Sequence, residues 1–367
     1  MILRNVQALR AIAALIVVAA HIGSDYGFET RYLSPSPFLM KPWANVGAYG
    51  VELFFIISGF IMVTTSWNAF GQPDASRRFI LRRFARIYPP VWIVSTFLLM
   101  LYLANPHAIN AHGSGHIDFL ASFLLLPQKD DPLLTVTWTL EFEMFFYLVF
   151  ALALLFPRRS FPIFAGTWAA LTILGNLLFR HSANAYLAFL GIPLPLEFLA
   201  GVLVGTFILR GKIRAPWTFT IGGTLIMLTA IFAHDRLAAL SPEIWPVWIQ
   251  VLLAIPLGAL LYGIVCLERN GKLILPKSLD ALGDASYAIY LWHVPVLGAL
   301  GLVCGHLHVH GILGHLAFIT IAFAAVIAWS LIFYHSVERP LTRYLNGLIG
   351  RPAALPQTTQ RPVSTTD

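Results

Sequence analysis

Apolar residues are gathered into ten long runs, and shorter polar segments separate these runs. Each run is long enough to cross a bilayer as an α-helix, which takes about 20 apolar residues at a rise of about 1.5 Å per residue. The pattern therefore predicts an all-α polytopic integral membrane protein with about ten transmembrane helices. The predicted spans are 5–23, 48–67, 87–105, 133–156, 161–179, 185–209, 216–233, 245–267, 285–304 and 313–335.

The distribution of Lys and Arg gives this layout an orientation. With the N-terminus in the cytosol, eighteen of the 24 Lys and Arg residues fall in cytosolic segments and five in outer segments. The remaining one, Arg10, lies inside the first span. Because positive residues concentrate on the cytosolic side of membrane proteins, we expect both termini to be cytosolic. The net charge of +7 is explained by topology, so we expect membrane lipids but no nucleic acid as partners.

Composition agrees with this class of protein. Hydrophobic residues make up 58% of the chain and charged residues 11%, against about 25% charged residues in soluble domains. The mean hydropathy is +0.74. The two cysteines, Cys266 and Cys304, lie in apolar runs and cannot form a disulfide framework.

Two segments fall outside the spans. The stretch Phe119–Leu126 is too short to cross the bilayer, and we expect it to lie in the interface. The tail Arg351–Asp367 is rich in Pro, Thr and Gln, a composition typical of disorder. The sequence thus predicts one transmembrane domain over residues 1–345 and a disordered cytosolic tail over residues 346–367.

The first span carries two ionisable residues, Arg10 and His21. At about 100° per residue, the eleven positions between them place both side chains on one helix face, about 16.5 Å apart along the axis. A charged group inside a bilayer is costly and usually faces a polar cavity, so the pair is a candidate functional site. The alternative is that Arg10 snorkels to the cytosolic headgroups and His21 caps the far end of the helix.

The second span and the segment after it carry two further patterns. In GVELFFIISGFIM, the small pair Ser58-Gly59 favours close helix packing in mid-membrane. The run RRFILRRFARIYPP, residues 77–90, alternates basic with apolar residues and predicts an interfacial helix on the cytosolic leaflet. Its arginines either anchor the chain to anionic headgroups or bind a phosphorylated cytosolic ligand, because guanidinium groups pair with phosphate through two hydrogen bonds.

Several motifs, in this order along the chain, resemble the membrane-bound acyltransferase 3 family. They are an arginine shortly before a histidine in the first span, GVELFFIISGF, RRFARIYP, Trp138–Glu143 with Phe146-Tyr147, Ser286–His293, and YHSVERP around Glu338. Trp138–Glu143 is similar to the family's Trp-Ser/Thr-Leu-x-x-Glu pattern, and Ser286–His293 to its Ser-Tyr-x-x-Tyr-Leu-x-His pattern. The resemblance covers residues 5 to about 345, and the compact chain looks most like the bacterial exopolysaccharide O-acetyltransferase branch.

The resemblance implies a function. Family members move acyl groups, commonly acetyl from acetyl-CoA, onto hydroxyls of surface glycans, lipids and antibiotics. We therefore expect a multi-pass O-acyltransferase of the bacterial inner membrane, with acyl-CoA as a donor substrate and no permanently bound cofactor. The expected acceptor is an exopolysaccharide, another surface glycan or a lipid-linked oligosaccharide. A lipid or small-molecule acceptor is the alternative within the family.

The chemistry assigns roles to the catalytic candidates His21, Glu143 and Arg10. A sugar hydroxyl is a weak nucleophile at neutral pH, and histidine, with an unperturbed pKa of about 6.5, is suited to take its proton. His21 either activates the hydroxyl for direct attack or carries the acyl group itself. A carboxylate inside the membrane needs a partner, so we expect Glu143 to orient or balance His21, with Glu141 as its rival.

The remaining candidates divide between donor and cavity. The donor-binding set is Arg86, Arg83, Arg82 and Tyr88. The supporting cavity set is Trp138, His293, Tyr290, Ser286 and Glu338. For His293 the alternative is a buried histidine satisfied by a backbone carbonyl, and for Trp138 a place in the interfacial aromatic belt.

Two histidine clusters lie in outer loops. They are His107, His112 and His116, and His306, His308, His310 and His315. No acidic or cysteine ligand at a structural-site spacing accompanies them, so we expect loop polarity and no metal.

Two other classes of protein remain to be weighed. A transporter or flippase also has many spans and buried charges, but such proteins often show paired repeats, and none is apparent here. A purely structural role gives no reason for ionisable residues within the membrane.

Overall fold

The computed structural model describes residues 3–24, 27–33, 38–106, 116–211, 214–240 and 245–350. In these ranges all regular structure is helical, and ten helical segments are long and apolar enough to cross a membrane. The predicted fold class and number of spans are therefore confirmed. The long helices are α1 (Arg4–Gly23), α3 (Gly47–Ser66), α4 (Ala75–Ala104), α6 (Trp138–Leu154), α7 (Phe161–Phe179), α9 (Pro195–Leu209), α10 (Pro216–Leu240), α11 (Trp245–Arg269), α13 (Ser286–His306) and α14 (Gly311–Phe333).

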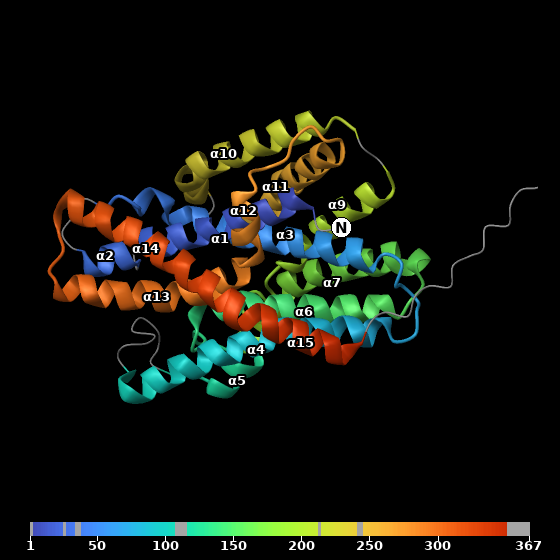
Figure 1. The fold of residues 1–367 in the computed structure, drawn as a ribbon. Coiled ribbons are helices and arrows are strands. Elements are labelled where there is room, and N and C mark those ends of the chain that lie inside the picture. Colours follow the sequence, from blue (N-terminus) through green and yellow to red (C-terminus); the bar gives the residue numbers. More distant parts are fainter. Residues whose placement is uncertain are drawn as a thin grey trace, which may run out of the picture.

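Short helices connect or extend these long ones (Figure 1). They are α2 (Phe28–Tyr32), α5 (Phe119–Leu124), α8 (Ala185–Leu190), α12 (Ser278–Asp284) and α15 (Arg339–Ile349). Within the described residues, short 3₁₀-helical segments lie at Lys41–Val46, Thr135–Thr137 and Arg158–Ser160, and a π-helical turn spans Tyr334–Glu338.

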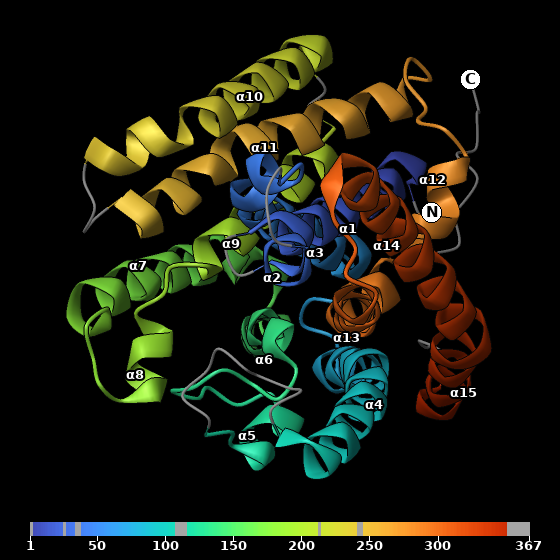
Figure 2. The same cartoon turned by 90° about the vertical axis from the view of Figure 1, so that its left-hand side faces the viewer.

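Helix α1 lies at the centre of the bundle (Figure 2). It packs against α3, α11, α12 and α13, and most of its side chains are buried. Small residues at the contacts between these helices allow the close approach. A methyl group on Gly50 of α3, for example, would lie 2.7 Å from the carbonyl oxygen of Ala13. The helix that carries Arg10 and His21 is thus surrounded by protein rather than by lipid.

Glycines also determine how closely α3 and α9 pack. A side chain on Gly59 would overlap the carbonyl oxygen of Phe198, and one on Gly201 would overlap that of Ile56. Small residues at such contacts let helix backbones meet, a common basis of helix association in membranes. The predicted packing role of Gly59 is confirmed.

The run predicted as an interfacial helix is helical but is not an element of its own. Residues 77–90 form the first half of α4, which continues through Pro89 and Pro90 without a break. Proline removes a backbone donor, and an isolated helix would be expected to kink or end there. Here the tertiary contacts decide: Arg83 and Arg86 face a cavity inside the protein, and the Tyr287 hydroxyl of α13 donates to the carbonyl of Ile87 at 2.9 Å.

Other predicted spans also have different bounds, and α10, predicted to end at 233, continues to Leu240. The span predicted over 185–209 is split into α8 and α9 at residues 191–194, next to Pro193 and Pro195. The last span does not end at 335, because the π-helical turn leads directly into α15. Helix α15 crosses the predicted domain boundary at 345, and residues 351–367 of the predicted tail lie outside the described part.

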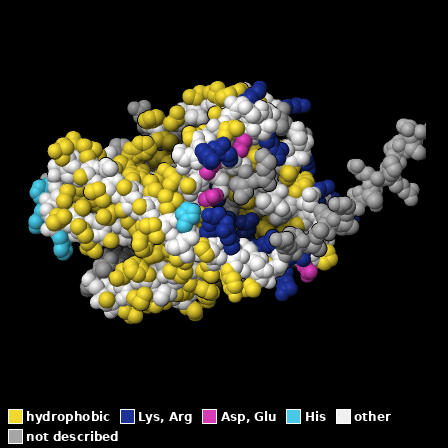
Figure 3. All heavy atoms as spheres, in the orientation of Figure 1, with side chains coloured by type: hydrophobic (Ala, Val, Ile, Leu, Met, Phe, Trp, Pro, Cys, Tyr) yellow, Lys and Arg dark blue, Asp and Glu magenta, His cyan; other side chains and the backbone are white. Residues whose placement is uncertain are grey.

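Charged and apolar side chains separate on the surface. In Figure 3, hydrophobic side chains cover much of the visible face, and Lys and Arg gather toward the end where Figure 1 places the N-terminus. Several histidines lie at the opposite end, and one lies beside the basic patch. This separation agrees with the sequence-based assignment of two membrane faces, whereas the cytosolic location of the termini stays a prediction.

Candidate active site

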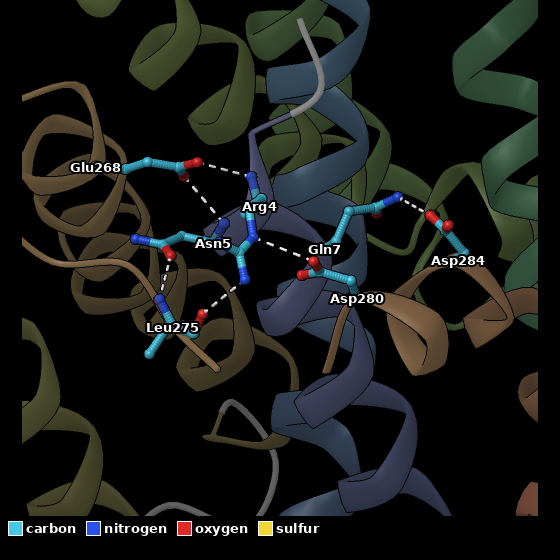
Figure 4. A network of polar contacts seen from close by, with 7 residues as sticks. All are labelled: Arg4, Asn5, Gln7, Glu268, Leu275, Asp280 and Asp284. Carbon is cyan, nitrogen blue, oxygen red and sulfur yellow. Dashed lines mark hydrogen bonds and ion pairs between the residues drawn. The ribbon is translucent and has the colours of Figure 1, made fainter. Parts of the chain in front are cut away.

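A polar clamp fixes the start of α1 (Figure 4). The Glu268 carboxylate accepts hydrogen bonds from the backbone N–H groups of Arg4 at 2.7 Å and Asn5 at 3.0 Å. The Arg4 side chain pairs with Asp280 at 3.1 Å, and Asn5 Oδ1 accepts from the Leu275 N–H at 2.8 Å. Because the first N–H groups of a helix have no partner within it, the clamp satisfies α1 and sets its axial position.

A short relay then holds Arg10. Its Nη1 donates to Gln7 Oε1 at 2.8 Å, and Gln7 Nε2 in turn donates to Asp284 Oδ1 (Figure 4 shows the second contact). Asp284 ends α12, so the relay ties α1 to the segment that precedes α13. Arg10 therefore lies in a defined position inside the protein, and the snorkelling alternative is wrong.

A large basic cavity opens beside this relay; we call it the vestibule. Its volume is about 1090 Å³. The lining includes Gln7, Asp284, Glu338 and seven arginines: Arg10, Arg78, Arg82, Arg83, Arg86, Arg339 and Arg343. Helices α1, α4 and α15 contribute these arginines, so the chain turns its positive charge inward here as well as toward headgroups.

The predicted donor residues lie only partly in the vestibule. Arg82, Arg83 and Arg86 line it, whereas Tyr88 lines neither the vestibule nor the pocket beneath it. The Tyr88 hydroxyl instead donates to the Leu124 carbonyl at 2.9 Å and joins α4 to α5. Its assignment to donor binding is corrected to a role in helix packing.

A smaller pocket of about 80 Å³ lies deeper between the helices; we call it the inner pocket. Arg10, Arg83 and Arg86 line both cavities, so this arginine triad forms the boundary between them. Ser58, Glu143, Tyr147, Ser286 and Tyr290 are among the other lining residues.

Two carboxylates face the arginine triad. Glu143 interacts electrostatically with all three arginines, and Glu338 with Arg10 and Arg86. Glu143 also accepts hydrogen bonds from the Tyr147 hydroxyl and, at 3.4 Å, from Ser58. Two opposed carboxylates offset part of the charge of the three guanidinium groups, which makes their burial tolerable and leaves them in net excess.

The expected pairing of Glu143 with His21 is therefore wrong. Glu143 is occupied by Tyr147, Ser58 and the arginine triad, and no hydrogen bond or ion pair of the described residues joins it to His21. Its rival Glu141 is contacted by Gln128 at 3.4 Å, on another face of α6.

His21 meets His293 instead. Their ring centroids lie 4.7 Å apart at an interplanar angle of 73°. His21 Nδ1 lies 2.9 Å from the Val17 carbonyl oxygen, and His293 Nδ1 lies 2.7 Å from that of Tyr290. A carbonyl only accepts, so each Nδ1 carries a hydrogen and each Nε2 of the neutral rings keeps a lone pair. The pair thus presents two nitrogens able to take a proton.

Tyr290 links the histidine pair to the inner pocket. It lines the pocket, its ring lies 5.8 Å from that of His293, and its hydroxyl contacts Thr139 Oγ1 at 2.6 Å. The structure thus brings Arg10, Arg83, Arg86, Glu143, Ser286 and Tyr290 around one pocket, with His21 and His293 just beyond its wall. Trp138 lines neither cavity: it is 43% exposed at the start of α6.

Several residues of this site escaped the sequence-based reasoning. Tyr147 lies one helical turn after Glu143, and Gln7 lies three residues before Arg10, so helix periodicity contained a signal for both. Asp284, Arg339 and Arg343 come from distant parts of the chain, and no local pattern connects them with Arg10. In the outer half, His315 Nδ1 pairs with buried Glu29 at 2.7 Å, which gives that histidine a structural partner.

A bundle of apolar spans around a buried polar site defines a multi-pass membrane protein with an internal reaction or binding centre. The chain belongs to the membrane-bound acyltransferase 3 family, whose acyltransferase domain matches residues 3–335. It is 34% identical over 334 residues to the exopolysaccharide production protein ExoZ of Rhizobium meliloti (strain 1021), an alignment that covers 84% of this chain and 96% of ExoZ.

Other relatives carry enzymatic names. The acyltransferase MdmB of Streptomyces mycarofaciens is 26% identical, with 80% of this chain and 79% of MdmB covered. The peptidoglycan O-acetyltransferase OatA of Listeria monocytogenes is 23% identical, with 80% of this chain and 49% of OatA covered. No solved structure matches. By family and relatives, the chain is an O-acyltransferase.

Proposed function

We propose that the protein transfers an acetyl group from acetyl-CoA to a hydroxyl of an exopolysaccharide or another cell-surface glycan. The observation that carries the proposal is the arginine triad, which borders both a basic vestibule and the inner pocket. Acetyl-CoA has the matching shape: a phosphorylated nucleotide at one end and a thioester at the tip of a long flexible arm. Guanidinium groups suit the phosphates because they donate paired hydrogen bonds.

In this arrangement the nucleotide occupies the vestibule and the arm passes the arginine triad into the inner pocket. The cavity sizes support this division, because about 1090 Å³ accommodates a nucleotide whereas about 80 Å³ accommodates only a narrow group. The acetyl end then points toward His21, about 16.5 Å beyond Arg10 along α1 at about 1.5 Å per residue.

The histidine pair supplies the base. As the acceptor oxygen attacks the thioester carbon, His21 Nε2 takes the hydroxyl proton, and the carbon–sulfur bond breaks. The departing thiolate then receives that proton from the imidazolium, so the products are the acetyl ester and CoA thiol. If His21 instead carries the acetyl group, CoA thiol leaves in the first step and the acceptor hydroxyl takes the acetyl group in the second, with the same products. His293 lies against His21 and limits the orientations open to its ring.

The exopolysaccharide acceptor is favoured by the likeness to ExoZ over most of both chains. OatA is named for peptidoglycan, another cell-surface glycan, whereas MdmB is named only as an acyltransferase; a lipid or small-molecule acceptor is the second candidate. We further propose the bacterial inner membrane as the location, with both termini and the vestibule on the cytosolic side.

The test is thiol release by purified protein in detergent. Acetyl-CoA alone should give little free thiol, and addition of the host's surface glycan should start steady release together with acetate ester on the glycan. Thiol release that does not depend on any glycan, or ester formation from a donor without CoA, would contradict the proposal.

A further inference from the structure

A second large cavity lies on the other side of α6 from the inner pocket. This groove has a volume of about 910 Å³ and is lined by α6, α7, α8 and the start of α9. In Figure 2, α7 and α8 lie to one side of α6, and residues of all three helices line the groove. None of the residues discussed as the candidate active site lines it.

The groove walls are almost entirely apolar. Phe142, Phe145, Phe164, Leu171 and Leu178 are typical of its lining, and the hydroxyl of Thr172 is already bonded to a carbonyl of its own helix at 3.0 Å. The lining thus fits a hydrocarbon rather than a sugar or a nucleotide. Ser160 and Thr167 also line the groove, and Trp168 Nε1 is buried without a hydrogen-bond partner among the described residues.

The length of the groove matches that of the membrane interior. Its lining on α7 extends from near Ser160 to Phe179, almost the whole helix. At about 1.5 Å per residue this is close to 30 Å, the thickness of the hydrocarbon core. The groove is therefore about as long as the hydrocarbon core is thick, and about 910 Å³ has room for roughly 30 groups of the size of a water molecule or methylene.

One end of the groove reaches the start of the helix that carries Glu143. Phe142 stacks on Phe189 of α8 with ring centroids 4.1 Å apart, and Trp138 lies edge-on to Phe142 at 6.3 Å. Trp138 is exposed there, and the next residue, Thr139, bonds Tyr290 beside the histidine pair. The start of α6 thus contacts both sites: Phe142 lines the groove, and Thr139 bonds Tyr290.

We infer that the groove binds the isoprenoid or fatty acyl chain of a lipid-anchored acceptor, so that the glycan is acylated while still attached to a membrane lipid. The inference rests on the proposed function and adds to it a site and a class of substrate. The chain lies along α7, and the first sugars emerge at Trp138, whose exposed ring suits stacking on a sugar.

The test compares two forms of one oligosaccharide from the host's surface glycan: a farnesyl diphosphate conjugate and a methyl glycoside. Leu171→Trp fills the groove, and Leu225→Trp on α10 is the matched control, because the two leucines are 60% and 58% exposed and only Leu171 lines the groove. Leu171→Trp should raise the KM for the farnesyl conjugate about tenfold by displacing a few methylene contacts. Its KM for the methyl glycoside should stay at the wild-type value.

Each outcome has one meaning. Equal KM values for Leu171→Trp and Leu225→Trp on the farnesyl conjugate overturn the groove assignment, as does an equal rise for both acceptors. Val149→Trp, which fills the groove from α6, repeats the test if Leu171→Trp does not fold. If wild-type protein acylates the methyl glycoside without any preference for the farnesyl conjugate, the groove proposal fails and the proposed function stands. If it acylates neither form, the proposed function fails.

Discussion

Replacing Arg86 by alanine removes one of the three guanidinium groups that border both the vestibule and the inner pocket. A hydrogen bond to a charged group contributes about 1.5–3 kcal/mol, and about 1.4 kcal/mol corresponds to a tenfold change in affinity. Because Arg86 lines an open cavity, solvent screens part of this contribution. We expect the dissociation constant of acetyl-CoA to rise about tenfold, with kcat much less affected.

The assay is calorimetric titration of acetyl-CoA into purified protein, combined with KM and kcat from thiol release. Arg86→Lys should give an intermediate affinity, because lysine keeps the charge but loses the paired donors. Arg78→Ala is the matched control: Arg78 also lines the vestibule, but Asp74 already pairs with it at 3.7 Å. Because Asp74 offsets part of the charge of Arg78, we expect a smaller loss of acetyl-CoA affinity in Arg78→Ala than in Arg86→Ala.

Wild-type affinity for acetyl-CoA in folded Arg86→Ala would refute this reasoning, because the triad would then have no contact with the donor. An equal loss of acetyl-CoA affinity in Arg78→Ala and Arg86→Ala would show that the vestibule attracts the donor only through its overall positive charge, without a defined phosphate contact. Thermal unfolding of each variant controls for the carboxylates Glu143 and Glu338, which lose part of their counter-charge when Arg86 is removed.

Three further predictions use other parts of the site. His21→Ala should abolish acetylation while acetyl-CoA binding stays near wild type, because the base is lost and the arginine triad is intact; near-normal ester formation at parental expression would exclude an essential role. Gln7→Ala should raise the KM for acetyl-CoA about threefold to tenfold by freeing the Arg10 guanidinium, at roughly 1 kcal/mol for one hydrogen bond; an unchanged KM in Gln7→Ala would show that Arg10 needs no positioning. In a background with Cys266 and Cys304 replaced by serine, an impermeant maleimide added to intact cells should label His308→Cys and spare Asn270→Cys, and the reverse pattern would invert the topology.

The fold was accessible from the sequence because a bilayer imposes a simple rule. Every span must be long and apolar, so hydropathy located all ten, and errors remained only where tertiary packing decides. Residues 77–90 were interpreted as an interfacial helix, yet α4 continues through Pro89 and Pro90 to Ala104, and Arg83 and Arg86 line the vestibule. The break between α8 and α9 depended on Pro193 and Pro195, whose effect a hydropathy reading does not register.

The site was less accessible. Arg10 and His21 were found because ionisable residues are rare within spans, and helix periodicity placed them on one face. Their partners were not predictable in the same way: His293 meets His21 and Glu143 meets Tyr147 and the arginine triad through the packing of α1, α4, α6 and α13. A single sequence shows which residues need a partner in the membrane, and the three-dimensional packing decides which partner each one finds.

The central claim is that the donor enters at the arginine end and the acetyl group leaves at the histidine end. Sealed vesicles that enclose the acceptor glycan test it most directly, when labelled acetyl-CoA is added only outside. Inside-out vesicles, identified by maleimide labelling of Asn270→Cys, should acetylate the enclosed glycan, and right-side-out vesicles should not until they are permeabilised. Acetylation by right-side-out vesicles alone, or equal acetylation by both, would contradict the account.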